Sequence, residues 1–297
     1  MKVEQVIIIG AGPAGLATAI QLKRYGVHPL LFERAQAGGL LRNANLVENY
    51  PGFPLGISGV DLVNLFMLQA QNLGIDVTYE AVIELSYDRG LFRVKTGGQR
   101  NYASRLAVLA TGTKPLRFSG LSIPEDLADQ VFYEVYNLLQ TERKHIVIVG
   151  SGDAAFDYAL NLSRKNTISI LNRGEHPKCL PLLWERSQKV SAITYRNNTE
   201  VCQLKKDSKE GMLLDCCSPA GGIQYHADYL VGAIGREACL DCLSEEFLQQ
   251  ARVLEEKGIL YMIGDVKNGI YRQTSIAVGE GVMTAMKICH QLKETSG

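Results

Sequence analysis

A short run of glycines near the N-terminus constrains the fold of this 297-residue chain more than any other feature. An apolar stretch at residues 6–9 leads into Gly10-Ala11-Gly12-Pro13-Ala14-Gly15, and a helical apolar period and a second apolar stretch at 29–32 follow. This pattern predicts a strand, a tight turn, a helix that stops at Gly26, and a second strand. A chain that begins in this way is expected to adopt an α/β fold.

The same pattern returns 140 positions later in the sequence. The shift needs no gap, and the matched turn residues are Gly10 with Gly150, Gly12 with Gly152, and Gly15 with Ala155. An ungapped repeat of this length indicates that a whole structural unit occurs twice. The chain is also longer than one hydrophobic core usually fills. We therefore expect two Rossmann-like domains, and because no low-complexity linker separates the copies, the second should be inserted into the first.

The glycine turn suits the pyrophosphate of a dinucleotide. The first glycine allows the tight turn, the second lets the backbone approach the phosphates, and the third lets the helix pack closely on the strand. Amides at the helix N-terminus receive the phosphate charge. Glu33 ends the second strand about 20 residues further on, where a carboxylate can accept hydrogen bonds from a ribose diol. The alternative is a turn with a purely structural role.

The two copies differ at the ribose-reading position. At the same shift of 140 residues, Glu33 falls on Arg173. A carboxylate repels a 2′-phosphate, whereas an arginine can hold one. The first copy therefore suits the ribose of FAD or NAD, and the second tolerates NADP. A solvated charge at a strand end is the alternative interpretation of Arg173.

The rest of the chain gives weaker signals. Residues 77–94 and 106–110 predict a small antiparallel excursion that returns to the first sheet, and the polar stretch 113–140 is expected to carry the first domain crossing. Residues 223–234 follow the second copy and end at Gly235-Arg236, and residues 274–292 read as a final helix.

Composition bounds the partners and the location. Lys plus Arg and Asp plus Glu are both 31, so the net field favours neither nucleic acid nor an anionic membrane. We find no run of about 18 apolar residues and no signal-peptide pattern, and expect a cytoplasmic protein. The seven cysteines are odd in number and unevenly spread, so most are expected to be reduced, buried thiols.

Seven motifs in one order resemble the low-molecular-weight thioredoxin reductases and their relatives. They are Gly10-x-Gly12-x-x-Gly15, Gly38-Gly39-Leu40-Leu41, Glu48-Asn49-Tyr50-Pro51-Gly52-Phe53-Pro54, Ala110-Thr111-Gly112, Gly150-x-Gly152-x-x-Ala155, Gly264-Asp265-Val266 and Tyr271-Arg272-Gln273. The resemblance spans nearly the whole chain and implies a homodimer. It implies an FAD-binding domain in two parts, 1–115 and 235–297, around an NAD(P)H-binding-like domain at 116–234.

The resemblance also assigns roles to individual residues. Glu33 would hold the adenosine ribose of FAD, Asp265 its ribityl chain, and Asn49 would lie near the isoalloxazine, which Arg272 and Gln273 approach from a helix N-terminus. A turn cap is the alternative for Asp265. The full set expected to contact FAD is Gly10, Gly12, Pro13, Ala14, Gly15, Glu33, Arg34, Gly39, Leu40, Asn49, Ala110, Thr111, Gly112, Gly264, Asp265, Arg272, Gln273 and Thr274. The set expected to contact the nicotinamide nucleotide is Gly150, Gly152, Asp153, Ala154, Ala155, Arg173 and Lys178.

Two departures from the family pattern limit what carries over. In thioredoxin reductases a Cys-x-x-Cys lies shortly before the second glycine motif, whereas residues 131–137 here contain no cysteine. The family's NADPH signature, His-Arg-Arg-x-x-x-Arg, aligns with residues 172–178, where Arg173 and Lys178 remain as cations. NADPH is therefore the expected nicotinamide cofactor, with NADH or none as alternatives.

The sequence at 131–137 and 150–160 is similar to the thioredoxin-reductase-like ferredoxin-NADP reductases, which also lack these cysteines but typically carry a C-terminal extension that has no counterpart here. The resemblance implies an FAD enzyme that takes a hydride from NAD(P)H and passes electrons to a ferredoxin or flavodoxin. Because the flavin performs the chemistry, we expect no catalytic side chain and no metal.

Two other functions stay open. Cys239-Leu240-Asp241-Cys242 has the spacing of a redox dithiol and would make the chain a disulfide reductase. Inert cysteines, or a metal site, are the other interpretations of this pair. The third function is that of a flavin-bound subunit or redox sensor without turnover.

Overall fold

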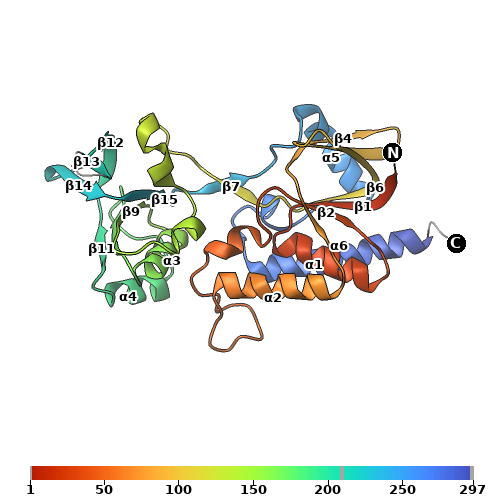
Figure 1. Ribbon diagram of the computed structural model, residues 1–297, viewed down its shortest axis with the longest axis horizontal. Coiled ribbons are helices and arrows are strands. Elements are labelled where there is room, and N and C mark those ends of the chain that lie inside the picture. The colour runs from red at the N-terminus through yellow and green to blue at the C-terminus, as the bar shows by residue number, and fades with distance from the viewer. Residues whose placement is uncertain (1, 208–210, 295–297) are drawn as a thin grey trace. The chain divides into compact units, whose positions relative to one another are not determined.

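The computed structural model describes residues 2–207 and 211–294, which form two compact units (Figure 1). Unit 1 comprises Met1–Arg42, Val47–Lys114 and Glu237–Gly297, and unit 2 comprises Asn43–Leu46 and Pro115–Arg236. The chain passes from unit 1 to unit 2 between residues 114 and 115 and returns between residues 236 and 237. The domain boundaries expected from the sequence, after residues 115 and 234, lie within two residues of these points. The passages run through β7 (Thr113–Pro115) and β16 (Arg236–Ala238), which pair as a two-stranded sheet.

Unit 1 is built on a seven-stranded sheet. Its strand order is β3-β2-β1-β6-β5-β4, and β17 pairs with β6. The pairs among β1, β2, β3, β6 and β17 are parallel, and β4, β5 and β6 pair antiparallel. The strands are β1 (Val3–Ile9), β2 (Leu30–Glu33), β3 (Val77–Tyr79), β4 (Val82–Asp88), β5 (Leu91–Thr96), β6 (Asn101–Leu109) and β17 (Leu260–Met262).

Helices cover both faces of this sheet (Figure 1). Because successive side chains of β1 point to opposite faces, Val6 and Ile8 pack on α1 (Pro13–Arg24) and α6 (Thr274–Glu294), while Ile7 and Ile9 pack toward α5 (Glu245–Glu256). The other helical segments of the unit are α2 (Gly59–Asn72), η1 (Gly39–Asn43) and η4 (Gly264–Val266). The parallel sheet is thus buried on both sides, as the α/β class requires.

The closest helix contact in unit 1 joins α6 to α1. A Cβ added at Gly281 would lie 2.4 Å from the carbonyl oxygen of Ala14, so only glycine allows the two helices to approach this far. The Thr18 hydroxyl donates to the Gly281 carbonyl oxygen at 3.2 Å. The C-terminal helix is therefore fixed directly over the helix that follows the first glycine turn.

Unit 2 contains a five-stranded parallel sheet of order β11-β10-β9-β15-β8 and a three-stranded antiparallel sheet of order β12-β13-β14. One face of the parallel sheet packs on α3 and the other on the antiparallel sheet. The elements are η2 (Glu125–Gln130), β8 (Val131–Phe132), η3 (Tyr136–Leu138), β9 (His145–Val149), α3 (Asp153–Leu162), β10 (Thr167–Leu171), α4 (Pro181–Gln188), β11 (Ile193–Arg196), β12 (Glu200–Lys206), β13 (Met212–Ser218), β14 (Gly221–Ala227) and β15 (Tyr229–Gly232).

The expected α/β fold with Rossmann-like units is confirmed, and so is the final helix, which runs over Thr274–Glu294. One detail was wrong. The segment Val77–Tyr79 is not antiparallel but extends the parallel sheet beside β2. Residues 223–234 hold the end of β14 and the whole of β15, and between these strands the Asp228 carboxylate accepts hydrogen bonds from the side chain of Lys144 and the backbone N–H of His145.

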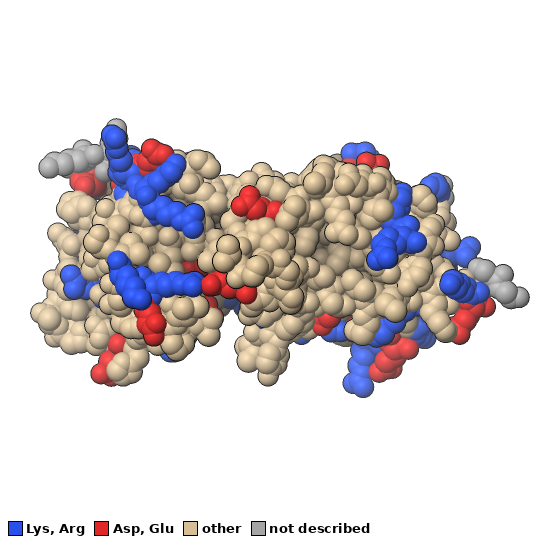
Figure 2. All heavy atoms as spheres, turned by 90° about the horizontal axis from the view of Figure 1, so that it is seen from below, with Lys and Arg blue, Asp and Glu red and all other residues tan. Residues whose placement is uncertain are grey.

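The surface carries charges of both signs. On the face shown in Figure 2, lysine and arginine lie in small groups among aspartate and glutamate, and neither sign covers the face. This agrees with the equal counts of cations and anions in the sequence. Within the part of the chain that the structure describes, no helix is both long and apolar enough to cross a membrane.

Candidate nucleotide-binding sites

The first glycine turn is shaped by two close backbone approaches. Gly10 has a φ of 104°, and a Cβ there would lie 2.4 Å from the carbonyl oxygen of Ala110. A Cβ on Gly15 would lie 1.9 Å from the carbonyl oxygen of Gly10. Gly12 caps the N-terminus of α1, has no side-chain hydrogen bond at the cap, and would meet nothing within 4 Å if it carried a Cβ. The turn is therefore closed toward the protein and open where a phosphate would approach the helix.

Glu33 is fixed beside this turn. One carboxylate oxygen accepts from the backbone N–H of Ala11 at 3.0 Å, and the other accepts from the N–H of Ala35 at 3.0 Å. The side chain is half-buried at the end of β2. Because each carboxylate oxygen can accept more than one hydrogen bond, the group keeps capacity for a ribose hydroxyl.

Segments from distant parts of unit 1 meet at the same turn. The N–H of Gly38 donates to the carbonyl oxygen of Ala11 at 2.7 Å, which brings Gly39 and Leu40 to the turn. A Cβ on Gly264 would lie 3.0 Å from the Cβ of Ala14, so η4 with Asp265 also lies at the start of α1. The structure thus brings together most of the residues expected to contact FAD.

A second group of these residues gathers at the start of α6. The Asn49 amide donates to the Gln273 side-chain oxygen at 2.7 Å, and the Ser275 hydroxyl donates to the Asn49 carbonyl oxygen at 3.2 Å. Glu280, one turn further along α6, accepts from the N–H of Gly264 at 2.6 Å. Helix α6 and the residue before it therefore link Asn49 to the segment that carries Asp265.

Unit 2 repeats the turn. A Cβ on Gly150 would lie 2.4 Å from the carbonyl oxygen of Ala233, and Gly152 is as open as its counterpart in unit 1. The N–H of Lys178 donates to the carbonyl oxygen of Ser151 at 2.7 Å, as Gly38 does to Ala11. In both units, a loop after the second strand of the repeat folds back onto the glycine turn.

In each unit, the register of the strand after the helix shows which residues correspond at the end of that strand. It corrects the expected match of Glu33 with Arg173. In unit 1 the first glycine of the turn donates to the carbonyl oxygen of Phe32, whereas in unit 2 Gly150 donates to that of Leu171. Phe32 therefore corresponds to Leu171, and Glu33 corresponds to Asn172. The expectation that Glu33 falls on Arg173 was wrong by one residue.

The one-residue error arises because two connections of the repeat differ in length by one residue in opposite directions. The connection from helix to strand is one residue shorter in unit 2, and the loop that returns to the turn is one residue longer, so an ungapped shift aligns the turns but not the strand end. Arg173 corresponds to Arg34, the residue after the ribose-reading position. Arg173 and Lys178 are both exposed on the loop that returns to the turn.

Asn172 braces this loop, which sequence reasoning missed. Its side-chain oxygen accepts from the N–H of Gly174 at 2.9 Å, and its amide nitrogen donates to the His176 carbonyl oxygen at 3.0 Å and the Tyr195 hydroxyl at 2.8 Å. The residue is only 6% exposed. The one available signal was an amide placed directly after a buried strand. Residues 172–178 are called the Arg173 loop below.

The helix after the second turn carries two aspartates with defined contacts. Asp153 accepts from the N–H of Leu180 at 2.7 Å, so it joins the start of α3 to the end of the Arg173 loop. Asp157 accepts from the N–H of Asn45 at 2.9 Å. Burial raises the pKa of the Asp157 carboxyl to about 6, and nearby backbone N–H groups oppose the shift. The segment Asn43–Leu46 is thus held on unit 2 partly by a carboxylate that is costly to ionise.

The stretch that lacks cysteines is ordered and packed inside unit 2. Tyr133 is 7% exposed, its hydroxyl accepts from the N–H of Phe118 at 3.2 Å, and the Arg117 guanidinium lies 4.4 Å from its ring centroid. The Tyr133 ring therefore packs within unit 2.

The seven cysteines comprise five free thiols, of which Cys179 is half-buried, and one disulfide-bonded pair. Cys216, Cys239, Cys242 and Cys289 are buried free thiols, as expected. Cys202 and Cys217 form a disulfide between β12 and β13 on an exposed surface, which corrects the expectation for these two. In the Cys239–Cys242 pair, burial raises the pKa of the Cys242 thiol to about 11. That thiol is therefore held in its unreactive, protonated form.

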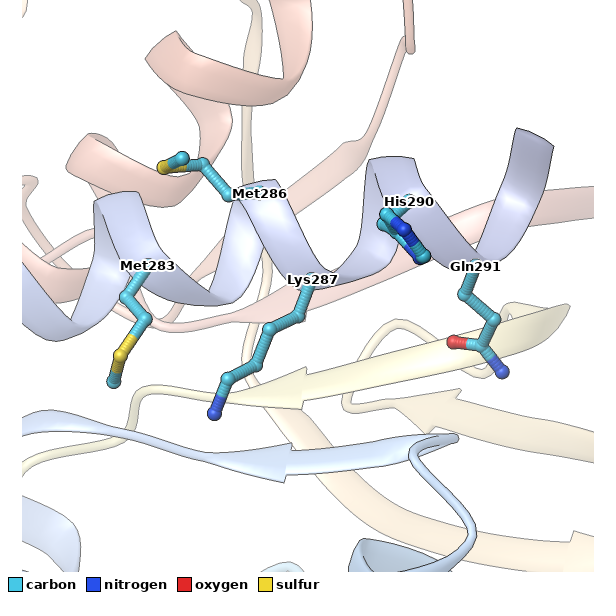
Figure 3. A pocket seen from close by; sticks show the side chains of 5 residues that line it. All are labelled: Met283, Met286, Lys287, His290 and Gln291. Carbon is cyan, nitrogen blue, oxygen red and sulfur yellow. The ribbon is translucent and has the colours of Figure 1, made fainter. Parts of the chain in front are cut away.

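A surface depression on α6 lies outside these sites. It is lined by Met283, Met286, Lys287, His290 and Gln291 (Figure 3). Figure 3 shows Met283, Lys287 and Gln291 projecting from the same side of the helix. No residue expected to contact a nucleotide lines it.

Comparison with known proteins agrees with this geometry. Residues 4–281 match the family model described as pyridine nucleotide-disulphide oxidoreductase. The chain belongs to this family. It is 28% identical to the thioredoxin reductase of Listeria innocua over 99% of this chain and 96% of that one. It is 32% identical to the thioredoxin reductase of Mycolicibacterium smegmatis over 70% of this chain and 67% of that one.

A solved structure supports the fold. The Lactococcus lactis thioredoxin reductase matches with a TM-score of 0.83 and 22% identity, over 98% of this chain and 99% of that one. The chain is thus a thioredoxin reductase-like, FAD-dependent oxidoreductase. The thioredoxin reductases use FAD and NADPH, which agrees with the cofactors expected from the sequence.

The residues of unit 1 fit FAD. The open position at Gly12 leaves room for a pyrophosphate beside the first turn of α1, and the Glu33 carboxylate is hydrogen-bonded to that turn at Ala11, at the strand end where such a carboxylate can accept from an adenosine ribose. Asn49 and Gln273, which the sequence resemblance assigns to the ring end of FAD, supply polar groups that are fixed against each other.

Proposed function

We propose that this chain is an FAD-dependent NAD(P)H oxidoreductase that passes electrons singly to a ferredoxin or a flavodoxin, without a protein dithiol. One observation carries the proposal. Residues 131–137, where the thioredoxin reductases that the sequence resembles have Cys-x-x-Cys, contain no cysteine. A dithiol relay needs two sulfurs at the flavin, and this segment offers packed aromatic side chains instead.

The Cys239–Cys242 pair is a poor substitute for that dithiol. Each of the two residues is 6% exposed, and Cys242 packs in the same hydrophobic cluster as Phe247 and Leu254. Thiol–disulfide exchange needs a thiolate that its substrate can reach. Burial and the raised pKa of the Cys242 thiol both oppose this.

The side chains of unit 1 then have binding and orienting roles. FAD, when bound, would supply the redox chemistry of hydride acceptance and one-electron release. The amides of the first glycine turn hold the pyrophosphate, and Glu33 holds the adenosine ribose. Asp265 holds the ribityl chain, and Asn49 with Gln273 orients the ring end.

Unit 2 binds the nicotinamide nucleotide, with a preference for NADPH. Its glycine turn is open at Gly152, and the Arg173 loop returns to that turn through Lys178 and Ser151. Arg173 and Lys178 are the exposed cations of the loop and contact the 2′-phosphate. Each charge-assisted contact contributes about 1.5 to 3 kcal/mol before solvent screening.

The deciding experiment is anaerobic reduction of the purified, FAD-loaded protein. We expect NADPH to bleach the flavin absorbance, and the reduced protein to pass electrons to ferricyanide and to a ferredoxin but not to a thioredoxin disulfide. The Cys239→Ser, Cys242→Ser double variant should keep the one-electron turnover. A robust disulfide reductase activity that this variant loses would overturn the proposal in favour of the displaced dithiol.

Failure of both NADPH and NADH to reduce the flavin would instead assign the chain to the flavin-bound proteins without turnover. We further propose that the protein is a homodimer, as its resemblance to thioredoxin reductases implies. Sedimentation of the FAD-loaded protein tests this, and a monomer would contradict it.

A further inference from the structure

The Cys202–Cys217 disulfide lies where two strands of the antiparallel sheet depart from regular pairing. Val201 pairs with Cys216 and Gln203 with Asp215, so Cys202 is the extra residue of a β-bulge. The bulge lets Cys202 and Gln203, which are adjacent, both face solvent. The Cα atoms of Cys202 and Cys217 are 6.3 Å apart across this bulge.

Both sulfurs are open to a small reagent. Cys202 and Cys217 are exposed, and β12 is the outer strand of its sheet. On the other side Cys217 pairs with Gly222 of β14, which has no side chain to cover it. Thiol–disulfide exchange requires a thiolate to reach one of the two sulfurs, and both cysteines of this pair are exposed.

The neighbouring cysteine cannot take part. Cys216 is 2% exposed and points into the core between the two sheets, where burial raises the pKa of its thiol to about 11. Exchange is thus confined to the exposed pair.

The strand that carries Cys202 also supports the Arg173 loop. Just before β12, the N–H of Thr199 donates to the Asn172 carbonyl oxygen at 2.9 Å, and the N–H of Asn198 donates to the Gly174 carbonyl oxygen at 2.9 Å. The side chain of Asn197 donates to the carbonyl oxygen of Glu175 at 3.1 Å. Thr199 is 3% exposed and lies three residues before Cys202. The disulfide therefore fixes the strand that begins directly after the residues that hold the loop in place.

We propose that Cys202–Cys217 is a thiol-exchangeable switch that sets the affinity of unit 2 for the 2′-phosphate of NADPH. The coupling rests on the proposed function of the Arg173 loop. When the disulfide is formed, β12 is fastened to β13 and the loop holds Arg173 in place. When it is reduced, the start of β12 loosens, and the loop loses part of its hydrogen-bonded support.

The reductant is a thiol. A thiolate attacks one of the two sulfurs and forms a new S–S bond to it. The Cys202–Cys217 bond breaks, and the departing cysteine sulfur leaves as a thiolate and takes a proton from water. A second thiol resolves the mixed disulfide. Two thiols are thus oxidised to one disulfide, and the protein gains two cysteine thiols.

The first test measures exchange itself. The full-length, FAD-loaded protein is equilibrated in buffers of graded reduced to oxidised glutathione, then alkylated and mapped by mass spectrometry. We expect Cys202 and Cys217 to be protected in the oxidising buffers and labelled together in the reducing ones, while Cys216 and Cys242 stay unlabelled. Labelling of Cys202 and Cys217 in every buffer, or a disulfide that resists glutathione until the protein unfolds, would overturn the proposal.

The second test measures coupling. Calorimetry should give an NADP⁺ dissociation constant three- to tenfold higher for the reduced protein, with NAD⁺ binding unchanged. Cys202→Ser should show the weaker value in both buffers, whereas Gln203→Ser, an exposed neighbour on the same bulge, should behave as the parent does. The amides of Asn172, Asn198 and Thr199 should exchange hydrogen faster in the reduced protein.

The outcomes separate the switch from the proposed function. Equal NADP⁺ dissociation constants in the two redox states would overturn the switch and leave the proposed function standing. NADP⁺ binding in neither state would overturn the proposed nucleotide site and the coupling with it.

Discussion

The two glycine turns have the same backbone design but differ in what holds the strand end beside them. In unit 1 the side chain of Glu33 bonds directly to the turn, through the N–H of Ala11. In unit 2 the corresponding Asn172 turns away and bonds to its own loop and to Tyr195. The first turn therefore holds a carboxylate beside it, and the second is followed by a braced loop with exposed cations. Under the proposed function, the two units bind different nucleotides because the residues around the turns differ, while the turns themselves are alike.

The helices after the turns also differ on the face away from the sheet. In unit 1, Ala17 and Ala14 lie under Gly281, so a helix packs closely on this face. In unit 2 the position matching Ala17 is Asp157, which accepts a hydrogen bond from the backbone of Asn45. A small apolar residue admits another helix, whereas a carboxylate recruits backbone N–H groups. At this helix position unit 1 therefore has an apolar contact between two helices, whereas the contact in unit 2 depends on the ionisation of Asp157.

The largest effect is expected from Gly15→Ala. Its Cβ would lie 1.9 Å from the carbonyl oxygen of Gly10, so the turn or the helix must shift, at a cost of about 3 kcal/mol. We expect loss of bound FAD and a lower melting temperature. The matched change in the other copy, Ala155→Gly, should cost only about 1 kcal/mol and keep FAD. Flavin absorbance measures the bound FAD of each variant, and thermal unfolding measures its stability. Equal losses of FAD and of stability in the two variants would show that the two turns do not differ in their requirement at this position.

Glu33→Ala should have the next largest effect. It leaves the buried N–H of Ala11 without its acceptor, which costs about 1 to 3 kcal/mol, and removes the ribose contact. The FAD dissociation constant should rise at least tenfold. Asn172→Ala should instead weaken NADP⁺ binding and leave FAD content unchanged. A loss of FAD in both variants would contradict the separate roles.

Arg173→Ala tests the proposed role of the Arg173 loop in binding the 2′-phosphate. The KM for NADPH should rise several-fold, because a charge-assisted contact to the 2′-phosphate is lost, while the KM for NADH stays nearly constant. Glu175→Ala, an exposed change in the same loop, serves as the control. Equal increases for NADPH and NADH would show that Arg173 is a structural residue.

Asp157→Asn should have the smallest effect, and its sign depends on pH. Burial raises the pKa of this carboxyl from 3.8 to about 6, so its contribution to stability is fully present below pH 3.8 and is lost as pH rises through 6. The uncharged amide should therefore raise the melting temperature at pH 8, with the gain shrinking toward pH 4. Asp129→Asn, at an exposed site of the same unit, serves as the control. A gain that does not vary with pH would contradict the assigned cause.

The sequence alone determined the two-unit α/β fold, the two glycine turns and the family. These follow from local chemistry, because a tight turn needs glycine and a buried parallel strand needs an apolar run, and both leave a pattern in adjacent residues. Thr274–Glu294 and the stop at Gly26 were readable for the same reason.

Only the tertiary structure decided the match of Glu33 to Asn172, the bond between Cys202 and Cys217, and the support that residues 196–199 give to the Arg173 loop. The match of Glu33 to Asn172 depends on strand register. In unit 2 the connection before the strand is one residue shorter and the loop after it is one residue longer, so the residue numbers agree again at the end of the loop although the strand between is shifted by one residue. The second depends on a bulge, which leaves no sign in the order of residues. The third consists of backbone hydrogen bonds between distant segments, and every residue carries the same backbone groups, so no side-chain pattern could reveal it.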